Sequence, residues 1–257
     1  MGLMARPESF RPTRLLFLAT AIVGLALGGC EVGMTGGPGG DDDSTGDDDS
    51  PADVDARVAM PSYRLSIAPP SASTALGTEV AYTVAVDATD FSGPVDLVAA
   101  GAPASWNVTI TPAQVNVLDG STVTATVRIV IPPNGEAATT GRALAINATA
   151  TPGAQSASAM LTVANEYRFP IAAGTGTGAH FGAMSGGLLR LREGTTLKIL
   201  NSDSTGHRIH AGGGVFDHQD ATMGPGASYT VTVAAGSDTF YCHDHGQGMG
   251  EVNVNAQ

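Results

Sequence analysis

The sequence predicts an all-β fold class, with two β-sandwiches that follow one another along the chain. The composition is rich in Gly, Ala, Val and Thr and poor in Lys, which favours strands over helices. Short alternating runs of apolar and polar residues, separated by turn clusters, recur from residue 62 onward. The 257 residues, with 42% hydrophobic content, are enough for one or two domains with buried cores.

Residues 1–29 are typical of an export signal. Three arginines precede an uncharged apolar run over residues 15–27, which is too short to span a bilayer comfortably. The run ends in Leu-Gly-Gly-Cys at Cys30, and this ending resembles the bacterial lipobox. The resemblance implies a lipoprotein signal peptide over residues 1–29 and a lipid on Cys30. An ordinary cleaved signal followed by an incidental cysteine is the alternative.

Residues 30–61 predict a disordered acidic tether. Residues 30–58 hold nine acidic side chains against one arginine, including the run Asp-Asp-Asp-Ser-Thr-Gly-Asp-Asp-Asp-Ser. Such a segment cannot bury enough apolar surface to order itself, and its charges repel one another. A calcium site is the alternative, since carboxylates and hydroxyls suit Ca²⁺, although no liganding loop is recognisable. Most of the net charge of −12 lies in this tether, and no basic surface remains for nucleic acid.

Residues 62–165 predict an immunoglobulin-like β-sandwich. Seven or eight short strands in about a hundred residues fit that architecture. The segment resembles the immunoglobulin-like modules of bacterial surface proteins, which implies a spacer or a protein-contact role. We expect Trp106 to pack in the core, with a ligand-facing aromatic as the alternative. The two clearest period-two patterns lie at Val80, Tyr82, Val84 and Val86 and at Val123, Ala125, Val127 and Ile129. Further strands are expected over residues 63–67, 94–99, 106–111, 144–148 and 157–163.

Residues 166–257 predict a second, smaller sandwich, and they carry the residues capable of chemistry. Seven strands are expected in about ninety residues. All six histidines of the protein lie in this segment, at His180, His207, His210, His218, His243 and His245. The strands are expected over residues 167–171, 188–191, 196–201, 207–210, 228–234, 238–241 and 251–254.

Residues 240–249 read Phe-Tyr-Cys-His-Asp-His-Gly-Gln-Gly-Met and suit copper. The thiol of Cys242, two imidazoles and the thioether of Met249 fall within eight residues. Soft sulfur binds Cu(I), imidazole binds either oxidation state, and a weak axial methionine favours cycling between them. If Cys30 carries a lipid, Cys242 has no disulfide partner in the chain. A lone thiol in an oxidising compartment then points to a bound metal.

The last ninety residues resemble a cupredoxin of the plastocyanin type. An Asn-x-Asp turn at residues 201–203 leads to His207, and Cys-x-x-His with a following Met comes about thirty-five residues later. The resemblance implies a Greek-key sandwich with one copper per chain, cycling between Cu(I) and Cu(II). Its ligands would be His207, Cys242 and His245, with Met249 as the axial ligand. Met249 follows His245 by four residues where the family usually has five, so Gln247 or a backbone carbonyl could be axial instead.

The remaining histidines are interpreted as non-ligands. Alternation along a strand places His207 and His210 on opposite faces, and separates His243 from Cys242 in the same way. A turn after Cys242 can return His245 to the thiol side. His210 is then expected either to contact a ligand or to lie at the surface. His218 is expected to cover the site from a neighbouring loop. His180 is expected to have no role in the site. Asn201 either ties the ligand loops together or simply forms the turn.

We expect an electron carrier and not an enzyme. Multicopper oxidases need several His-x-His pairs, and this chain has one, at residues 243–245. A three-histidine zinc hydrolase would leave Cys-x-x-His and Met249 unexplained. A copper-handling lipoprotein without electron transfer, or a surface scaffold with a metal-free cupredoxin-like domain, are the alternatives. The sequence predicts a monomer that a lipid anchors to a bacterial envelope membrane. An unidentified redox partner is expected to dock at the His245 edge, among residues 212–214, Gly246, Gly248 and Met223.

Overall fold

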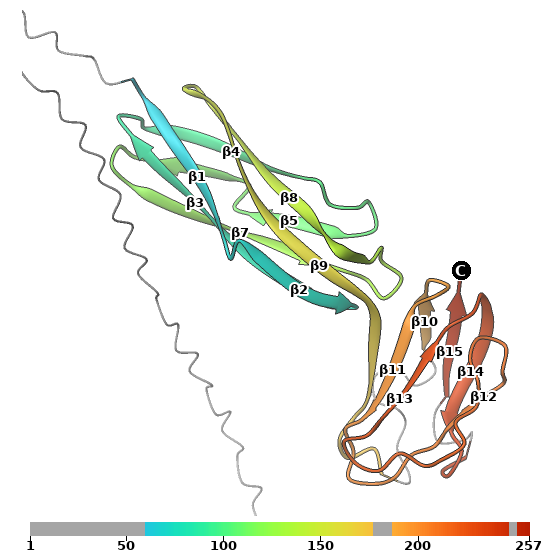
Figure 1. Cartoon of the computed structure of the whole chain (residues 1–257). Coiled ribbons are helices and arrows are strands. Elements are labelled where there is room, and N and C mark those ends of the chain that lie inside the picture. The colour runs from blue at the N-terminus through green and yellow to red at the C-terminus, as the bar shows by residue number, and fades with distance from the viewer. Residues whose placement is uncertain (1–59, 177–186, 247–250) are drawn as a thin grey trace, which may run out of the picture. The chain divides into compact units, whose positions relative to one another are not determined.

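The structure is a computed structural model that describes residues 60–176, 187–246 and 251–257 (Figure 1). The regular elements within these ranges are all β-strands. They form sheets around two hydrophobic cores, so the predicted all-β fold class with sandwich domains is confirmed. The described ranges hold no helix with the length and apolar character that a membrane crossing requires.

Two groups of strands enclose the first core. One sheet has the order β1-β3-β7-β5, and the other contains β9-β8-β4-β6, with β2 paired in parallel to β9. The strands are β1 (Ser62–Ala68), β2 (Ser71–Leu76), β3 (Glu79–Thr89), β4 (Gly93–Ala100), β5 (Asn107–Thr111), β6 (Gln114–Val117), β7 (Thr122–Val130), β8 (Ala138–Ala150) and β9 (Gly153–Ile171).

The alternation read from the sequence matches the burial in this core. Tyr82, Val84 and Val86 on β3 are all at most 1% exposed, because period-two spacing turns them to the same face. Trp106 is 5% exposed and donates its Nε1–H to the carbonyl of Glu136 at 2.8 Å, so its predicted core position is confirmed. The short strands β2 and β6 were not expected, since β2 consists mostly of small and polar residues with little alternation.

The second core lies between the sheet β10-β15-β14-β12 and the end of β9 paired with β11 and β13. At its centre the ring of Phe240 meets Phe169 edge to face, with ring centroids 5.2 Å apart. The strands are β10 (Leu188–Leu191), β11 (Thr196–Asn201), β12 (Ile209–Ala211), β13 (Ser228–Thr232), β14 (Gly236–Cys242) and β15 (Glu251–Ala256).

One strand, β9, takes part in both groups of sheets. Its first part pairs antiparallel with β8 from Gly153 to Val163, and its last part pairs in parallel with β11 from Glu166 to Ile171. The strand therefore runs without a break through residues 165–167, where the sequence predicts the join between the two domains.

Two features of the second core position the histidine and cysteine side chains. β12 begins at Ile209 and not at His207 as expected, because His207 forms a separate bridge with Met223. β14 and β15 pair antiparallel, with Tyr241 opposite Glu251. The segment that begins at Cys242 therefore connects two neighbouring strands of the sheet.

Candidate metal centre

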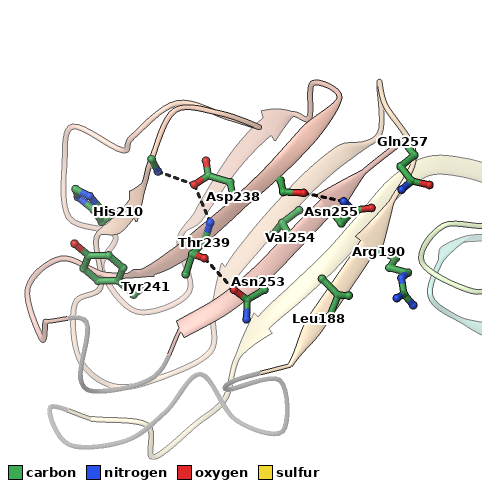
Figure 2. Close-up of a pocket in the computed structure, with 12 residues that line it drawn as sticks. Leu188, Arg190, His210, Asp238, Thr239, Tyr241, Asn253, Val254, Asn255 and Gln257 are labelled. Carbon is green, nitrogen blue, oxygen red and sulfur yellow. Dashed lines mark hydrogen bonds between the residues drawn. The ribbon is translucent and has the colours of Figure 1, made fainter.

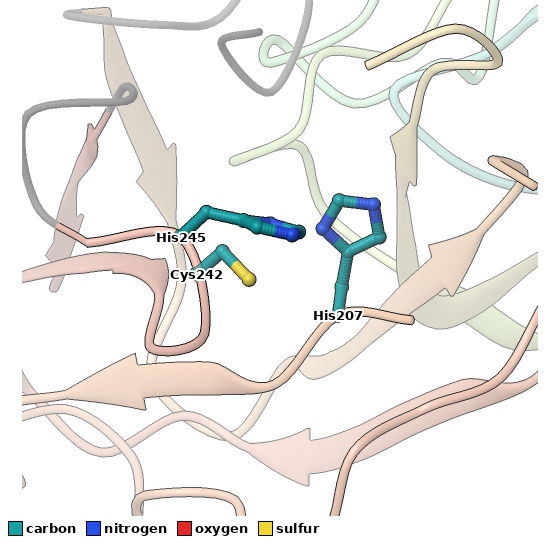
Figure 3. A group of neighbouring side chains, drawn as sticks. All are labelled: His207, Cys242 and His245. Atoms are coloured by element: carbon teal, nitrogen blue, oxygen red, sulfur yellow. The ribbon is translucent and has the colours of Figure 1, made fainter. Parts of the chain in front are cut away.

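The structure brings together three of the four predicted copper ligands. The ligand atoms of His207, Cys242 and His245 all lie within 4.8 Å of one another. Figure 3 shows the thiol and both imidazole rings directed at the same space. Two donors on one ion, each with a bond of about 2.0–2.3 Å, are at most roughly 4.6 Å apart. The group is therefore close to the geometry that one metal ion requires.

The backbone around His207 is fixed by its neighbours. His207 and Met223 exchange two backbone hydrogen bonds, with N···O distances of 3.0 and 2.7 Å, and the His207 side chain is fully buried. Asn201 closes the preceding turn, since its Nδ2 donates to the Thr205 carbonyl at 2.8 Å and its Oδ1 accepts from the Asp203 amide at 3.0 Å. Asn201 also donates to the Met223 carbonyl at 3.0 Å. Its observed contacts thus match the turn-forming interpretation.

A buried carboxylate orients the His207 ring. Asp203 accepts hydrogen bonds from the amides of Gly174 and Gly176 and from the Thr205 hydroxyl, at 2.7–2.8 Å. The Thr205 hydroxyl, followed by His207 and the backbone amides of Ser204 and Gly176, holds the pKa of Asp203 far below its usual range, while burial opposes this shift. Nε2 of His207 lies 3.1 Å from Oδ2 of Asp203, and because an ionised carboxylate only accepts, Nε2 carries the hydrogen. In a neutral ring, the lone pair is then on Nδ1.

Replacement of Asp203 by alanine is expected to lower copper affinity about 10–100-fold, because carboxylates that fix a ligand imidazole typically contribute this much. Competition with a copper chelator measures the change. Glu193→Ala removes an exposed carboxylate from the same domain and should leave the affinity unchanged. Equal affinities for the two variants would contradict the orienting role of Asp203.

Cys242 and His245 are positioned by the end of β14. Cys242 pairs with Ile209 across the sheet, is 4% exposed and forms no disulfide within the described residues. The amides of His245 and Gly246 both approach the Cys242 carbonyl, at 3.3 and 3.0 Å. Gly246 has φ of +80°, which glycine adopts without strain. This tight turn returns His245 to the thiol side of the strand, as the sequence predicted.

His245 is the part of the group that reaches solvent. Its side chain is partly exposed, whereas His207 and Cys242 are buried. Residues 212–214 do not surround this edge, and the expectation that they do is wrong: the amides of residues 212 and 214 donate to Asp238, near the start of β14. Antiparallel pairing of β12 with β14 carries the chain after Ala211 away from Cys242. Met223 is buried as well.

Several predicted residues lie outside the described ranges. They are the axial candidate Met249, its alternative Gln247, the lipidation candidate Cys30 and the histidine His180. The assignment of Met249 as the axial ligand therefore stays a prediction.

A second group of histidines lies on the other side of β14. The ligand atoms of His210, His218 and His243 are all within 4.8 Å of one another. His210 pairs with Tyr241 across the sheet, one position from the inward pair of Ile209 and Cys242, so alternation separates the two groups as predicted. His218 was expected to cap the copper ligands, and this is wrong because it contacts His210 and His243 instead. No sequence spacing signals the position of His218, which lies in a loop.

The surroundings of His243 disfavour its charged form. Loss of water around the ring lowers its pKa, and the charge of Arg208 and the imidazoles of His218 and His210 act in the same direction, while Asp244 opposes them. Neutral imidazole is the form that binds metal.

A groove of about 810 Å³ runs along the outer face of the sheet β10-β15-β14-β12. His210 and Tyr241 line one part of it, and Arg190 and Asn255 line another (Figure 2). His207, Cys242 and His245 are not among its lining residues. The groove therefore adjoins the second histidine group and not the first.

Comparisons with known proteins identify no family. No family model matches the chain, and no curated protein matches it. Similar solved structures include a family 123 glycoside hydrolase from Clostridium perfringens, with 12% identity, a TM-score of 0.30, and coverage of 39% of this chain and 26% of that one. The E. coli chaperone DraB has 13% identity and a TM-score of 0.30, over 76% of this chain and 96% of that one.

A protein of unknown function from Porphyromonas gingivalis has 13% identity and a TM-score of 0.28, over 77% of this chain and 100% of that one. The chain spans about a quarter of the length of the glycoside hydrolase, with coverage of 26%. Similarities at these TM-scores carry no conclusion about activity, so the functional assignment depends on the residues themselves.

Proposed function

We propose that this protein is a copper-binding, one-electron carrier of the cupredoxin kind, with one copper per chain bound by His207, Cys242 and His245. The observation that carries the proposal is the convergence of two imidazoles and one thiol, from two separate parts of the chain, within 4.8 Å. Met249 is proposed as the weak axial ligand, with Gln247 as its alternative.

The donor set fits copper. One thiolate and two imidazoles with a weak fourth ligand are the ligands of copper electron-transfer sites. The Cys242 side chain is buried beside the two imidazoles and forms no disulfide in the described ranges. Its sulfur would therefore be available to bind a metal ion. When bound, copper supplies one-electron redox chemistry between Cu(I) and Cu(II).

The residues of the chain contribute rigidity and access. Asp203 and Met223 hold His207, and the pairing of β14 with β12 holds Cys242, so these two ligands would move little when the charge of the site changes. His207 would bind through Nδ1, because its Nε2 donates to Asp203. The partly exposed His245 would give the electron a route to solvent. One electron enters from a reduced partner protein and one leaves to an oxidised partner, with no atoms transferred.

The rest of the chain is proposed to hold this domain near a membrane. A lipid on Cys30, the acidic tether over residues 30–61 and the first sandwich would together place the copper domain at a distance from an envelope membrane. We propose that the protein acts as a monomer that meets its redox partner through a small, transient interface, as is typical of electron-transfer encounters.

Addition of Cu(II) to the purified protein tests the assignment. We expect an intense visible band from thiolate-to-copper charge transfer, and its complete loss in Cys242→Ser. His180→Gln is the matched control and should keep the band. Weak ligand-field absorption that survives Cys242→Ser would reject the electron carrier and favour a copper-handling lipoprotein. Absence of any copper binding would instead favour a surface scaffold.

A further inference from the structure

Three imidazole rings converge on the outer face of β14, outside the group proposed to bind the copper that transfers electrons. The ring centroids of His210 and His218 are 4.8 Å apart, those of His218 and His243 are 5.2 Å apart, and those of His210 and His243 are 5.3 Å apart. The three ligand nitrogens lie within 4.8 Å of one another, as close as the donors of the first group. The arrangement has the dimensions of a site for one ion.

Each of the three rings comes from a fixed piece of backbone. His210 lies in β12, and the His243 amide donates to the Arg208 carbonyl at 2.7 Å, so both follow the sheet. The loop that carries His218 is fastened on both sides. The Tyr229 hydroxyl donates to the carbonyl of residue 217 at 2.6 Å, and residue 219 exchanges two hydrogen bonds with Ile209, each of 3.0 Å. The convergence is therefore built by the fold and does not depend on one flexible side chain.

The ring nitrogens are poorly satisfied by hydrogen bonds within the described structure. Nδ1 of His210 faces Nδ1 of His243 at 3.4 Å, and at most one hydrogen can lie between two neutral rings there. Nδ1 of His218 is buried without a hydrogen-bond partner in the described residues. A buried polar atom of this kind costs free energy unless it is paired. A metal ion would accept the lone pairs of all three rings.

We propose that His210, His218 and His243 bind a second metal ion, a divalent transition ion of the zinc and copper class. Imidazole is a common ligand of both metals, and three histidines with one open position form a recognised zinc coordination set. His243 is exposed and His210 borders the groove of about 810 Å³, so the fourth position is open to water or to a small anion. The positive charge of Arg208 nearby is offset by Asp244, with the two groups 3.3 Å apart.

The second site is distinct from the first although the two share a strand. Cys242 and His243 are consecutive, and alternation directs one inward and the other outward. Loss of the thiol of Cys242 should thus leave the second site intact. This property separates a failure of the second site from a failure of the proposed electron-carrier function.

Zinc titration of the full-length Cys242→Ser protein tests the second site. Isothermal titration calorimetry should show one tightly bound Zn²⁺ per chain. Adding His218→Gln, which keeps the side-chain volume but removes the imidazole, should weaken that affinity by at least about 10-fold, since even outer-shell partners contribute this much. Adding His180→Gln instead should change nothing. An unchanged affinity with His218→Gln would overturn the proposal.

Two further variants test whether a loss of zinc binding results from misfolding. His210→Gln and His243→Gln, each in the Cys242→Ser background, should produce the same loss of zinc binding while thermal unfolding of the metal-free proteins stays similar. With Cu(II) in place of zinc, electron paramagnetic resonance should show hyperfine coupling to several nitrogens, which His218→Gln reduces. A copper spectrum that none of the three substitutions changes would reject the site.

Discussion

Replacement of His207 by glycine is expected to lower copper affinity by more than about 100-fold. Loss of a residue that only hydrogen-bonds to a ligand lowers metal affinity about 10–100-fold, and loss of the ligand itself should lower it more. Added imidazole should not restore binding, since the His207 side chain is fully buried. His245→Gly should also lose the thiolate-to-copper band. Here added imidazole should restore it, because the His245 side chain is partly exposed.

Visible spectra recorded during imidazole titration of both variants measure this contrast. His180→Gln provides the control for removal of a histidine that neither proposed site uses. Equal rescue of His207→Gly and His245→Gly would contradict the assignment of His245 as the solvent-facing ligand. Failure of His207→Gly to change the spectrum would remove His207 from the ligand set.

Replacement of Phe240 by alanine is expected to lower the free energy of unfolding by about 3–5 kcal/mol, the usual cost of removing a buried phenylalanine ring. Phe240 is fully buried and its ring packs edge to face on Phe169 and against Phe216, with centroids 5.2 and 5.7 Å apart. Because Phe240 lies two residues before Cys242 on β14, the cavity should also loosen the thiol and weaken copper binding.

Urea unfolding followed by circular dichroism measures the loss of stability. Fluorescence of Trp106, the one tryptophan of the chain, reports on the first core and should change less. Leu118→Ala is the control, since Leu118 is 68% exposed and its replacement should cost little. A loss below about 1 kcal/mol for Phe240→Ala would show that the ring does not hold the second core together.

Strand alternation and turn signals in the sequence were enough to predict much of this fold and site. The pattern at Tyr82, Val84 and Val86 predicts a buried face because side chains in a strand have a period of two. The same rule separates Cys242 from His243. The turn that returns His245 to the thiol follows from the glycine at position 246.

Contacts between distant parts of the chain could not be predicted in this way. Asp203 orients His207, yet two of its other partners, Gly174 and Gly176, lie almost thirty residues earlier in the sequence. His218 joins the second histidine group through a loop whose path depends on hydrogen bonds to Ile209 and Tyr229. Periodicity describes one element at a time, so it carries no information about such contacts.

The pairing of Tyr241 with Glu251 fixes the points between which the chain segment with Cys242 and His245 connects β14 to β15. The residues on either side of 242–250 are held opposite each other by the antiparallel register of β14 and β15. Residues could therefore be added or removed after Gly246 while Cys242 keeps its pairing with Ile209. The protein would then serve as a scaffold in which the length of one loop tunes the coordination, and with it the reduction potential, of the proposed metal ion.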